Sequence, residues 1–228
     1  MVETTPFNII NLKNEFLNKL RTYFITVDPR ERVELKQKSF TADGSKTKFF
    51  LNDYMSCVVQ VKVNGVIVKF GEAYNIIWRG GDKGSVEFLV APLVNDEIVV
   101  DFGVAEEGNM IYPDFPRTDL GENSYPRIGF KVTVNSERIG GSGVKSAAYN
   151  NEILIQIRVI DSDTYVIDSL VQELDDYFKI RFKSFYYVPY IDPQSINEYD
   201  DYMDNTEKNH SKIISFRVPY KYDIKQVV

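Results

Sequence analysis

The single histidine, His210, is the first residue to consider for catalysis, because imidazole serves as a general base in many hydrolytic sites. It stands in a polar, acidic stretch where no rigid element is expected to hold a nucleophile and a carboxylate around it. The single cysteine, Cys57, lies in a valine-rich segment, which is typical of a buried free thiol. We therefore expect that the chain is not an enzyme.

Two other stretches have residue types found in ligand sites. Gly140–Ser146 contains the glycines and lysine of a phosphate-binding loop, but Val144 separates the last glycine from Lys145, and a strand rather than a helix should follow. The acidic segment Glu198–Asp204 could attract a divalent cation, yet it lacks the glycine and the ligand order of a calcium loop. A flexible loop and a solvated acidic loop are the simpler interpretations, so we expect no cofactor and no metal.

The composition limits the class of protein. A chain of 228 residues suits one or two cores, and we favour two. Its net charge of −6 and the lack of a long basic run disfavour a broad nucleic-acid surface, although DNA could slide past an acidic wall without binding. One cysteine excludes an internal disulfide, and no apolar run approaches the roughly 20 residues that span a bilayer. Since no signal peptide is recognisable either, we expect a soluble protein that is not secreted.

The residues from Asn151 to Val188 organise the rest of the chain. Isoleucine and valine alternate through 152–160, which predicts a strand with one apolar face. Asp161–Thr164 then supplies N-caps for an amphipathic helix with apolar residues every three or four positions up to Phe178. A β-rich segment, Phe182–Val188, follows the helix, and Ile213–Tyr222 predicts a last strand. The helix must pack on a sheet formed by these strands, so the fold class is α+β.

The first hundred residues have two different periods. Thr5 and Pro6 predict the start of a helix whose apolar face ends before Asp28-Pro29. From Arg32 the period becomes two, with turn signals such as Asn64-Gly65, which predicts a small all-β module of short strands. We expect strands at Val33–Phe40, Lys48–Leu51, Val58–Val63, Val66–Phe70, Ala73–Trp78, Ser85–Val90 and Glu97–Phe102.

Three polar segments are predicted to be connections. Gly103–Ser124 carries glycines and prolines among polar residues and should be a linker before a strand at Tyr125–Val134. Asn135–Asn150 and Asp192–Asp204 have few packing residues, so we expect loops that become ordered only on contact with a partner.

The β-rich part resembles a module that recurs in virion proteins of tailed phages. The resemblance covers about seventy residues. It lies in Phe40-Thr-Ala-Asp-Gly-Ser-Lys-Thr47, then Val63-Asn-Gly-Val66, and then Ala91-Pro92 followed by Asp96-Glu-Ile98. It implies an inserted β-sandwich or β-barrel-like module at 32–103, which would leave 1–31 and 104–228 as one α+β domain with an antiparallel or mixed sheet and packed helices.

Those flanking parts resemble the tail-terminator and tail-completion proteins of tailed phages. The order is an amphipathic helix at Thr5–Phe24 and, within Tyr125–Tyr222, a Pro-Arg-Ile strand, a loop, an Ile-Leu-Ile-Gln-Ile strand, a capped helix and an Ile-Ser-Phe-Arg-Val-Pro-Tyr strand. The resemblance implies a structural virion protein that forms a homo-oligomeric ring, a hexamer, at the head–tail joint. It would be made in the host cytoplasm and contact the tail tube and the neck or connector rings.

Two alternatives remain open beside a tail terminator: a neighbouring neck ring, and a tail-fibre or baseplate attachment protein that binds its partner through the β-module. The sequence is rich in tyrosine and phenylalanine near its C-terminus, and such residues favour the centres of interfaces as well as sheet cores. The hypothetical interface residues are Arg127, Phe130, Arg138, Lys145, Tyr186, Tyr187, Tyr190, Tyr220 and Tyr222.

Overall fold

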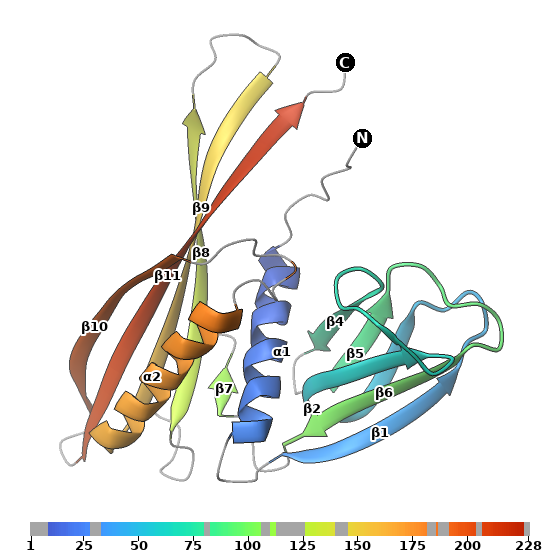
Figure 1. The fold of residues 1–228 in the computed structure, drawn as a ribbon, viewed down its shortest axis with the longest axis horizontal. Coiled ribbons are helices and arrows are strands. Elements are labelled where there is room, and N and C mark those ends of the chain that lie inside the picture. The colour runs from blue at the N-terminus through green and yellow to red at the C-terminus, as the bar shows by residue number, and fades with distance from the viewer. Residues whose placement is uncertain are drawn as a thin grey trace. The chain divides into compact units, whose positions relative to one another are not determined.

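The computed structural model describes residues 9–27, 33–79, 83–105, 110–112, 126–139, 146–181, 186, 192–203 and 207–225. The chain divides into two compact units, unit 1 (Met1–Asn109) and unit 2 (Met110–Val228). The described residues form two helices, and most of the others lie in strands (Figure 1). This confirms the predicted α+β class.

Unit 1 contains a six-stranded sheet in the order β1-β6-β2-β5-β4, with β3 paired to β2. Its long strand β2 joins two halves, because its first part pairs with β5 and its second part with β6 and β3. The sequence predicted two separate strands here, Lys48–Leu51 and Val58–Val63, where the structure has one strand with register shifts. The strands are β1 (Glu34–Thr41), β2 (Lys48–Val63), β3 (Val66–Val68), β4 (Tyr74–Arg79), β5 (Lys83–Phe88) and β6 (Glu97–Val104).

The strands of unit 1 enclose a continuous apolar core. Alternate residues of β6 from Ile98 to Val104 point inward, as the two-residue period predicts, whereas β2 buries four consecutive residues, Met55–Val58, where its register shifts, and aromatic rings fill the centre. The rings of Phe49 and Phe88 meet edge to face with centroids 5.8 Å apart. The buried members are Ala42, Phe49, Leu51, Met55, Val58, Val61, Tyr74, Ile76, Val86, Phe88, Ile98, Val100, Phe102 and Val104.

Helix α1 (Ile9–Val27) belongs to unit 1. Its predicted start at Thr5 lies outside the described residues, whereas its end at Val27 agrees with the expected stop before Asp28. The predicted apolar face is buried at Leu12, Phe16, Leu17, Leu20 and Phe24.

Polar side chains of α1 bind the backbone of β2. Asn18 accepts from the Val58 N–H at 2.7 Å and donates to the Val58 carbonyl at 2.9 Å, next to an irregularity in the pairing of β2 with β6. The amide thereby satisfies backbone groups that a regular ladder would pair. Arg21 donates to the Ser56 carbonyl at 3.0 Å and lies over the ring of Trp78. The observed division therefore assigns α1 to the unit of the β-module, whereas the sequence analysis assigned 1–31 to the domain of 104–228.

Unit 2 is a five-stranded mixed sheet in the order β10-β11-β9-β8-β7, on which helix α2 (Thr164–Arg181) packs (Figure 1). Only the β7–β8 pair is parallel among the described strands. The predicted apolar face of the central strand is confirmed, since Ile153, Ile155, Ile157 and Val159 are buried. The strands are β7 (Ile111–Tyr112), β8 (Arg127–Ile139), β9 (Ser146–Asp161), β10 (Asp192–Met203) and β11 (Glu207–Lys225).

The predicted start of α2 is also confirmed. The Asp163 carboxylate accepts a hydrogen bond from the Tyr165 N–H at 2.8 Å, which is the geometry of an N-cap. Farther along the helix, the ring centroids of Phe178 in α2 and Phe216 in β11 are 4.6 Å apart, so the two rings pack together. Helix and sheet therefore share one core.

Two predicted loops of unit 2 are largely strands, and the predicted linker before them contains a short one. The linker 103–124 contains β7, and most of the predicted loop 135–150 is the end of β8 and the start of β9. The acidic segment 192–204 is β10, which pairs with β11. The prediction was wrong for these two loops because their sequences are mostly polar and have no apolar period, whereas pairing with neighbouring strands forms them. The predicted strand Phe182–Val188 lies outside the described residues except for Tyr186, which is in a bend.

Candidate interaction surfaces

Two of the predicted interface residues are interior residues. Arg127 and Phe130 are exposed to only 1% and 0%, so neither offers surface to a partner. Both lie in β8, where four consecutive residues from Arg127 to Phe130 are buried. The sequence misplaced Arg127 because an arginine is seldom fully buried, and a buried one must have polar partners inside the protein.

The remaining predicted residues fall into three groups. Tyr186 is 49% exposed and can contact a partner. Arg138 and Tyr222 both pair with Tyr149 of β9, one from each side, so the sheet brings together two residues that are far apart in the sequence. Tyr220 pairs with Asn151, two residues farther along β9. Lys145, Tyr187 and Tyr190 lie outside the described residues.

Arg138, Tyr220 and Tyr222 belong to a three-stranded extension that we call the arm. The arm consists of Val134–Ile139 of β8, Ser146–Ile153 of β9 and Val218–Lys225 of β11. Its pairing is unbroken, because β9 keeps register with β11 from Asp161 to Ser146 and with β8 from Ile160 to Ala148. Figure 1 shows these three strands continuing past the end of α2. The arm is thus a hydrogen-bonded sheet extension beyond the part that the helix covers.

A second surface lies in unit 1, at the loop between β5 and β6. Leu89, Val90, Leu93 and Val94 are exposed by 53%, 79%, 74% and 63%, and we call this set the apolar loop. Four large aliphatic side chains are exposed within six residues, which makes this loop a candidate interaction site. The sequence analysis assigned Leu89 and Val90 to a strand end and missed the loop. Pro92 was the available signal, because proline seldom occupies a central strand.

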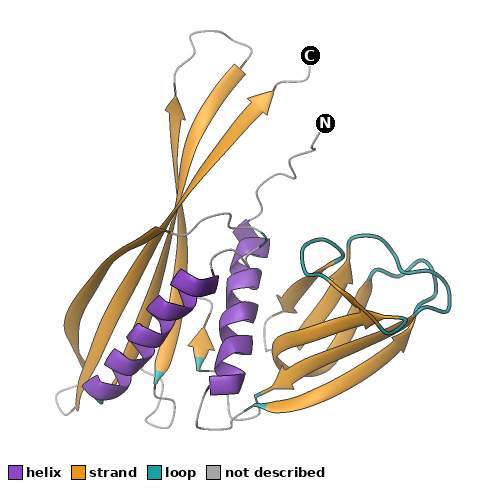
Figure 2. Cartoon of the chain, in the orientation of Figure 1, coloured by secondary structure: helices purple, strands orange, loops and turns teal. Residues whose placement is uncertain are grey.

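The apolar loop is held in one conformation by hydrogen bonds. The Leu93 N–H donates to the Asp96 carboxylate at 2.8 Å, and the Asn95 N–H donates to the Ala42 carbonyl at 2.9 Å. Asp96 also accepts from the Asn64 side chain at 2.7 Å, which ties the loop to the β2–β3 turn. Figure 2 shows these connections as loops at the end of the β-module. The aliphatic side chains are therefore displayed on a preorganised backbone, which lowers the entropy lost on binding.

A neighbouring turn adds negative charge to this end. The Asp43 carboxylate accepts hydrogen bonds from the backbone N–H groups of Ser45 and Lys46, which lower the pKa of Asp43. Gly44, at φ 81°, sits against Val94, since a β-carbon on it would lie 2.5 Å from the Val94 Cγ2 atom. The turn and the apolar loop therefore touch, with a carboxylate beside the aliphatic side chains.

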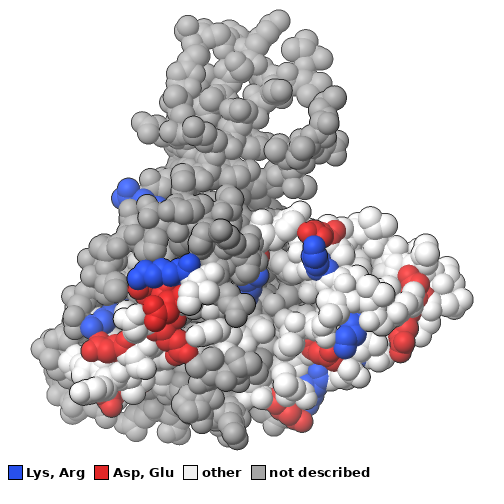
Figure 3. Space-filling model, in the orientation of Figure 1, with Lys and Arg blue, Asp and Glu red and all other residues white. Residues whose placement is uncertain are grey.

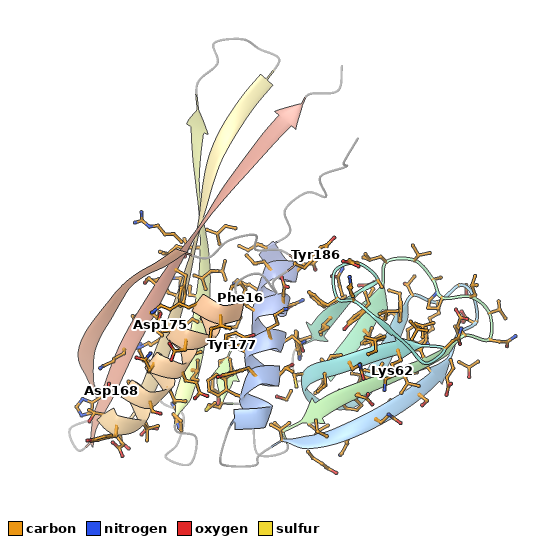
Figure 4. All side chains as sticks on the ribbon, in the orientation of Figure 1. Phe16, Lys62, Asp168, Asp175, Tyr177 and Tyr186 are labelled. Carbon is orange, nitrogen blue, oxygen red and sulfur yellow. The ribbon has the colours of Figure 1, made fainter. Side chains whose placement is uncertain are left out.

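Charges elsewhere are mixed in sign. On the described part of the face in Figure 3, lysines and arginines lie near aspartates and glutamates. Asp168 and Asp175, both labelled on α2 in Figure 4, pair with Lys212 and Lys179. Such exposed pairs contribute little to the free energy of folding, and their mixture gives no broad basic surface on that face.

The residues considered for catalysis are placed as follows. His210 lies in strand β11 opposite Asp161 and Asp200, not in the predicted loop. Burial raises the pKa of Cys57 to about 11, so the thiol stays protonated and is a poor nucleophile near neutral pH. The described residues contain no group of three or more His, Cys, Asp or Glu side chains arranged to hold a metal ion. Neither described helix is long and apolar enough to cross a membrane.

In comparisons with known proteins, no family model, curated protein or solved structure matches the chain.

Proposed function

We propose that the protein is a structural component of a tailed-phage virion: a tail terminator or neck subunit that forms a sixfold ring between the tail tube and the head connector. The order of sequence patterns in 5–24 and 125–222 supports this proposal. The α+β sheet with α2 packed on one face is compatible with it. A net charge of −6 suits a lumen through which DNA passes without being bound.

The observation that carries the proposal is the arm. A ring needs a heterologous contact, in which one surface of each subunit meets a different surface of the next. The arm has two different edges, β8 on one side and β11 on the other, with β9 between them. Each copy therefore has one edge for each neighbour.

Size and shape of the purified full-length chain test the proposal. Six copies of the 26.3 kDa chain give a particle of about 158 kDa, which mass photometry resolves from the monomer. We expect this species at micromolar concentration, and class averages in negative stain should show a ring with a central opening. A chain that stays monomeric at 100-fold higher concentration, with and without isolated tail tubes, would contradict the proposal.

The apolar loop favours a second candidate, a tail-fibre or baseplate attachment protein. In that case Leu93 and Val94 would insert into a partner, and ring formation would not be needed. Leu93→Asp is the informative change, because Leu93 is 74% exposed and its loss should leave the fold intact. A terminator carrying Leu93→Asp should still form its ring, whereas an attachment protein should lose its place on the virion.

Val66→Asp is the matched control, since Val66 is also exposed, by 67%, but lies outside the apolar loop. Particles assembled with each variant are imaged, and occupancy at the neck and at the far end of the tail is compared. Loss of occupancy at the far end with Leu93→Asp alone would favour the attachment protein.

A further inference from the structure

The two edges of the arm have no strand neighbour among the described residues. On one side, β7 pairs with β8 only at Ile128 and Gly129, and the sheet order ends there. On the other side, β10 pairs with β11 only as far as Arg217. The outer sides of Val134–Ile139 and Val218–Lys225 therefore each present a row of backbone groups that another strand can pair with.

Hydrogen bonding shows which backbone groups of β8 face outward. The Ile128 N–H donates to the Met110 carbonyl at 2.9 Å, away from β9. In an antiparallel pair, residues alternate between those bonded to the partner strand and those turned the other way. The register of β8 with β9 is unbroken from Arg127 to Ile139, so the N–H and C=O groups of Val134, Ser136 and Arg138 also point outward.

The alternation of bonded and outward-turned residues also applies to β9 and, through its pairing with β9, to β11. It therefore determines which backbone groups of β11 point outward. It turns the backbone groups of Pro219, Lys221 and Asp223 away from β9. The identity of Pro219 agrees independently, because proline has no N–H and fits a strand only where no ladder bond is required of it.

The two outer edges lie at the same level and run in the same direction. Ser136 of β8 and Tyr220 of β11 both pair with Asn151 of β9, and both strands are antiparallel to β9. In a parallel ladder, each residue bonds to the residues before and after its opposite neighbour. With no shift along the strand, the Ser136 N–H would meet the Pro219 carbonyl and the Lys221 N–H would meet the Ser136 carbonyl. The two rows of outward groups are therefore complementary except at one point: the Val134 carbonyl, opposite Val218, would face Pro219, which has no N–H to donate.

We propose that copies of this chain join side by side by parallel pairing of the outer edge of β8, Val134–Ile139, with the outer edge of β11, Val218–Asp223, of the next copy. The occupant of each edge is a second copy, because one chain carries both halves of a ladder that match in direction and level. Repetition of this contact is heterologous, and it forms a ring when the rotation from one copy to the next closes after a whole number of copies. The inference rests on the proposed ring and deepens it by naming the contact.

A disulfide placed across the two edges tests the contact. Ser136→Cys with Tyr220→Cys puts two thiols at one level. Within one chain β9 separates these positions by about two strand spacings, roughly 9.5 Å, which is too far for a disulfide. Between paired copies they would be about 5 Å apart, within the range of Cα distances that a disulfide spans. We expect mild oxidation of the full-length double variant to give covalent oligomers up to the size of the ring.

The matched control is Ser136→Cys with Ile224→Cys. Ile224 lies on the same strand and face as Tyr220 but four residues farther along, or roughly 13 Å. This pair should give at least 10-fold less covalent oligomer. Ser136→Pro supplies a second measurement, because it removes an outward N–H without removing a bond to β9, and it should lower the oligomer fraction at unchanged circular dichroism.

Each outcome has one meaning. Disulfide formation by the Ser136/Tyr220 cysteine pair, without it in the Ser136/Ile224 control pair, supports the proposal. Equal disulfide formation by the control pair overturns it. If the wild-type chain forms a ring but the Ser136/Tyr220 cysteine pair forms no disulfide, the proposed strand pairing is overturned and the proposed ring is not. Dimers formed by Ser136→Cys alone indicate two β8 edges paired antiparallel, which also overturns the proposal. A wild-type chain that is monomeric throughout overturns both this contact and the proposed function.

Discussion

Unit 1 and unit 2 are both built on sheets, but their strand pairing is fixed in different ways. In unit 1, strands are joined by tight turns at positive φ, such as Asn64 at 51°, Gly65 at 78° and Gly44 at 81°, and its one long strand, β2, changes register along its length. In unit 2, β9 has 16 residues and β11 has 19, and they keep one register from His210 to Lys225. Local turn chemistry therefore sets the register of unit 1, whereas long ladders set that of unit 2.

This difference predicts where each unit is sensitive to substitution. A turn residue that needs positive φ is sensitive to substitution, because few other residues tolerate that conformation. A long ladder distributes its stability over many backbone bonds, so its weak points are the side chains that join the sheet to α2. The substitutions below test this contrast.

The largest effect is expected for Phe216→Ala in unit 2. Phe216 is fully buried and its ring meets that of Phe178, so its loss removes both apolar burial and a ring contact. Large-to-small changes of this kind cost about 3–5 kcal/mol of unfolding free energy. Denaturant titration followed by circular dichroism should show the loss.

The one tryptophan, Trp78, lies in unit 1 and serves as the internal control. If the two units unfold separately, the transition seen by Trp78 fluorescence should stay in place for Phe216→Ala and shift for Phe102→Ala, which empties a core position of unit 1. Equal shifts of both probes in both variants would show that the two units unfold as one.

The sequence predicted best those elements whose signal is local. Asn64-Gly65 predicted its turn because two adjacent residues must adopt positive φ, and both do. The isoleucines of β9 predicted a strand with one buried face because the pleat places alternate side chains together.

The sequence failed where pairing rather than periodicity makes the element. The ends of β8 and β9 and the whole of β10 were expected to be loops, since a ladder of polar residues has no signature within its own segment. Of the candidate surfaces, the sequence predicted tyrosines that lie in the arm but not the apolar loop, and it placed the buried Arg127 at an interface. Exposure depends on tertiary contacts, which local patterns do not contain.

A smaller effect is expected for the glycines of unit 1. Gly44→Ala places a β-carbon at positive φ and 2.5 Å from the Val94 Cγ2 atom, so backbone strain and a steric contact add. Gly65→Ala introduces the strain alone, because nothing lies within 4 Å of its β-carbon. We expect losses of about 2 and about 1 kcal/mol respectively, measured through Trp78 fluorescence. Equal losses would mean that Val94 moves away without cost and that the apolar loop is not rigid.

The smallest effect is expected for the N-cap of α2, where a single local residue of unit 2 fixes the start of an element. Asp163→Ala removes the acceptor of the Tyr165 N–H and a negative charge at the positive end of the helix, which should cost about 1 kcal/mol. Asp163→Asn keeps the acceptor and should lose only the charge contribution.

Asp168→Ala is the control. It removes a carboxylate of the same helix that is paired with Lys212 but more than half exposed, so it should cost less than the cap. Urea titrations of the three variants rank these terms, and a loss for Asp163→Asn as large as that for Asp163→Ala would show that charge, not capping, determines how α2 begins.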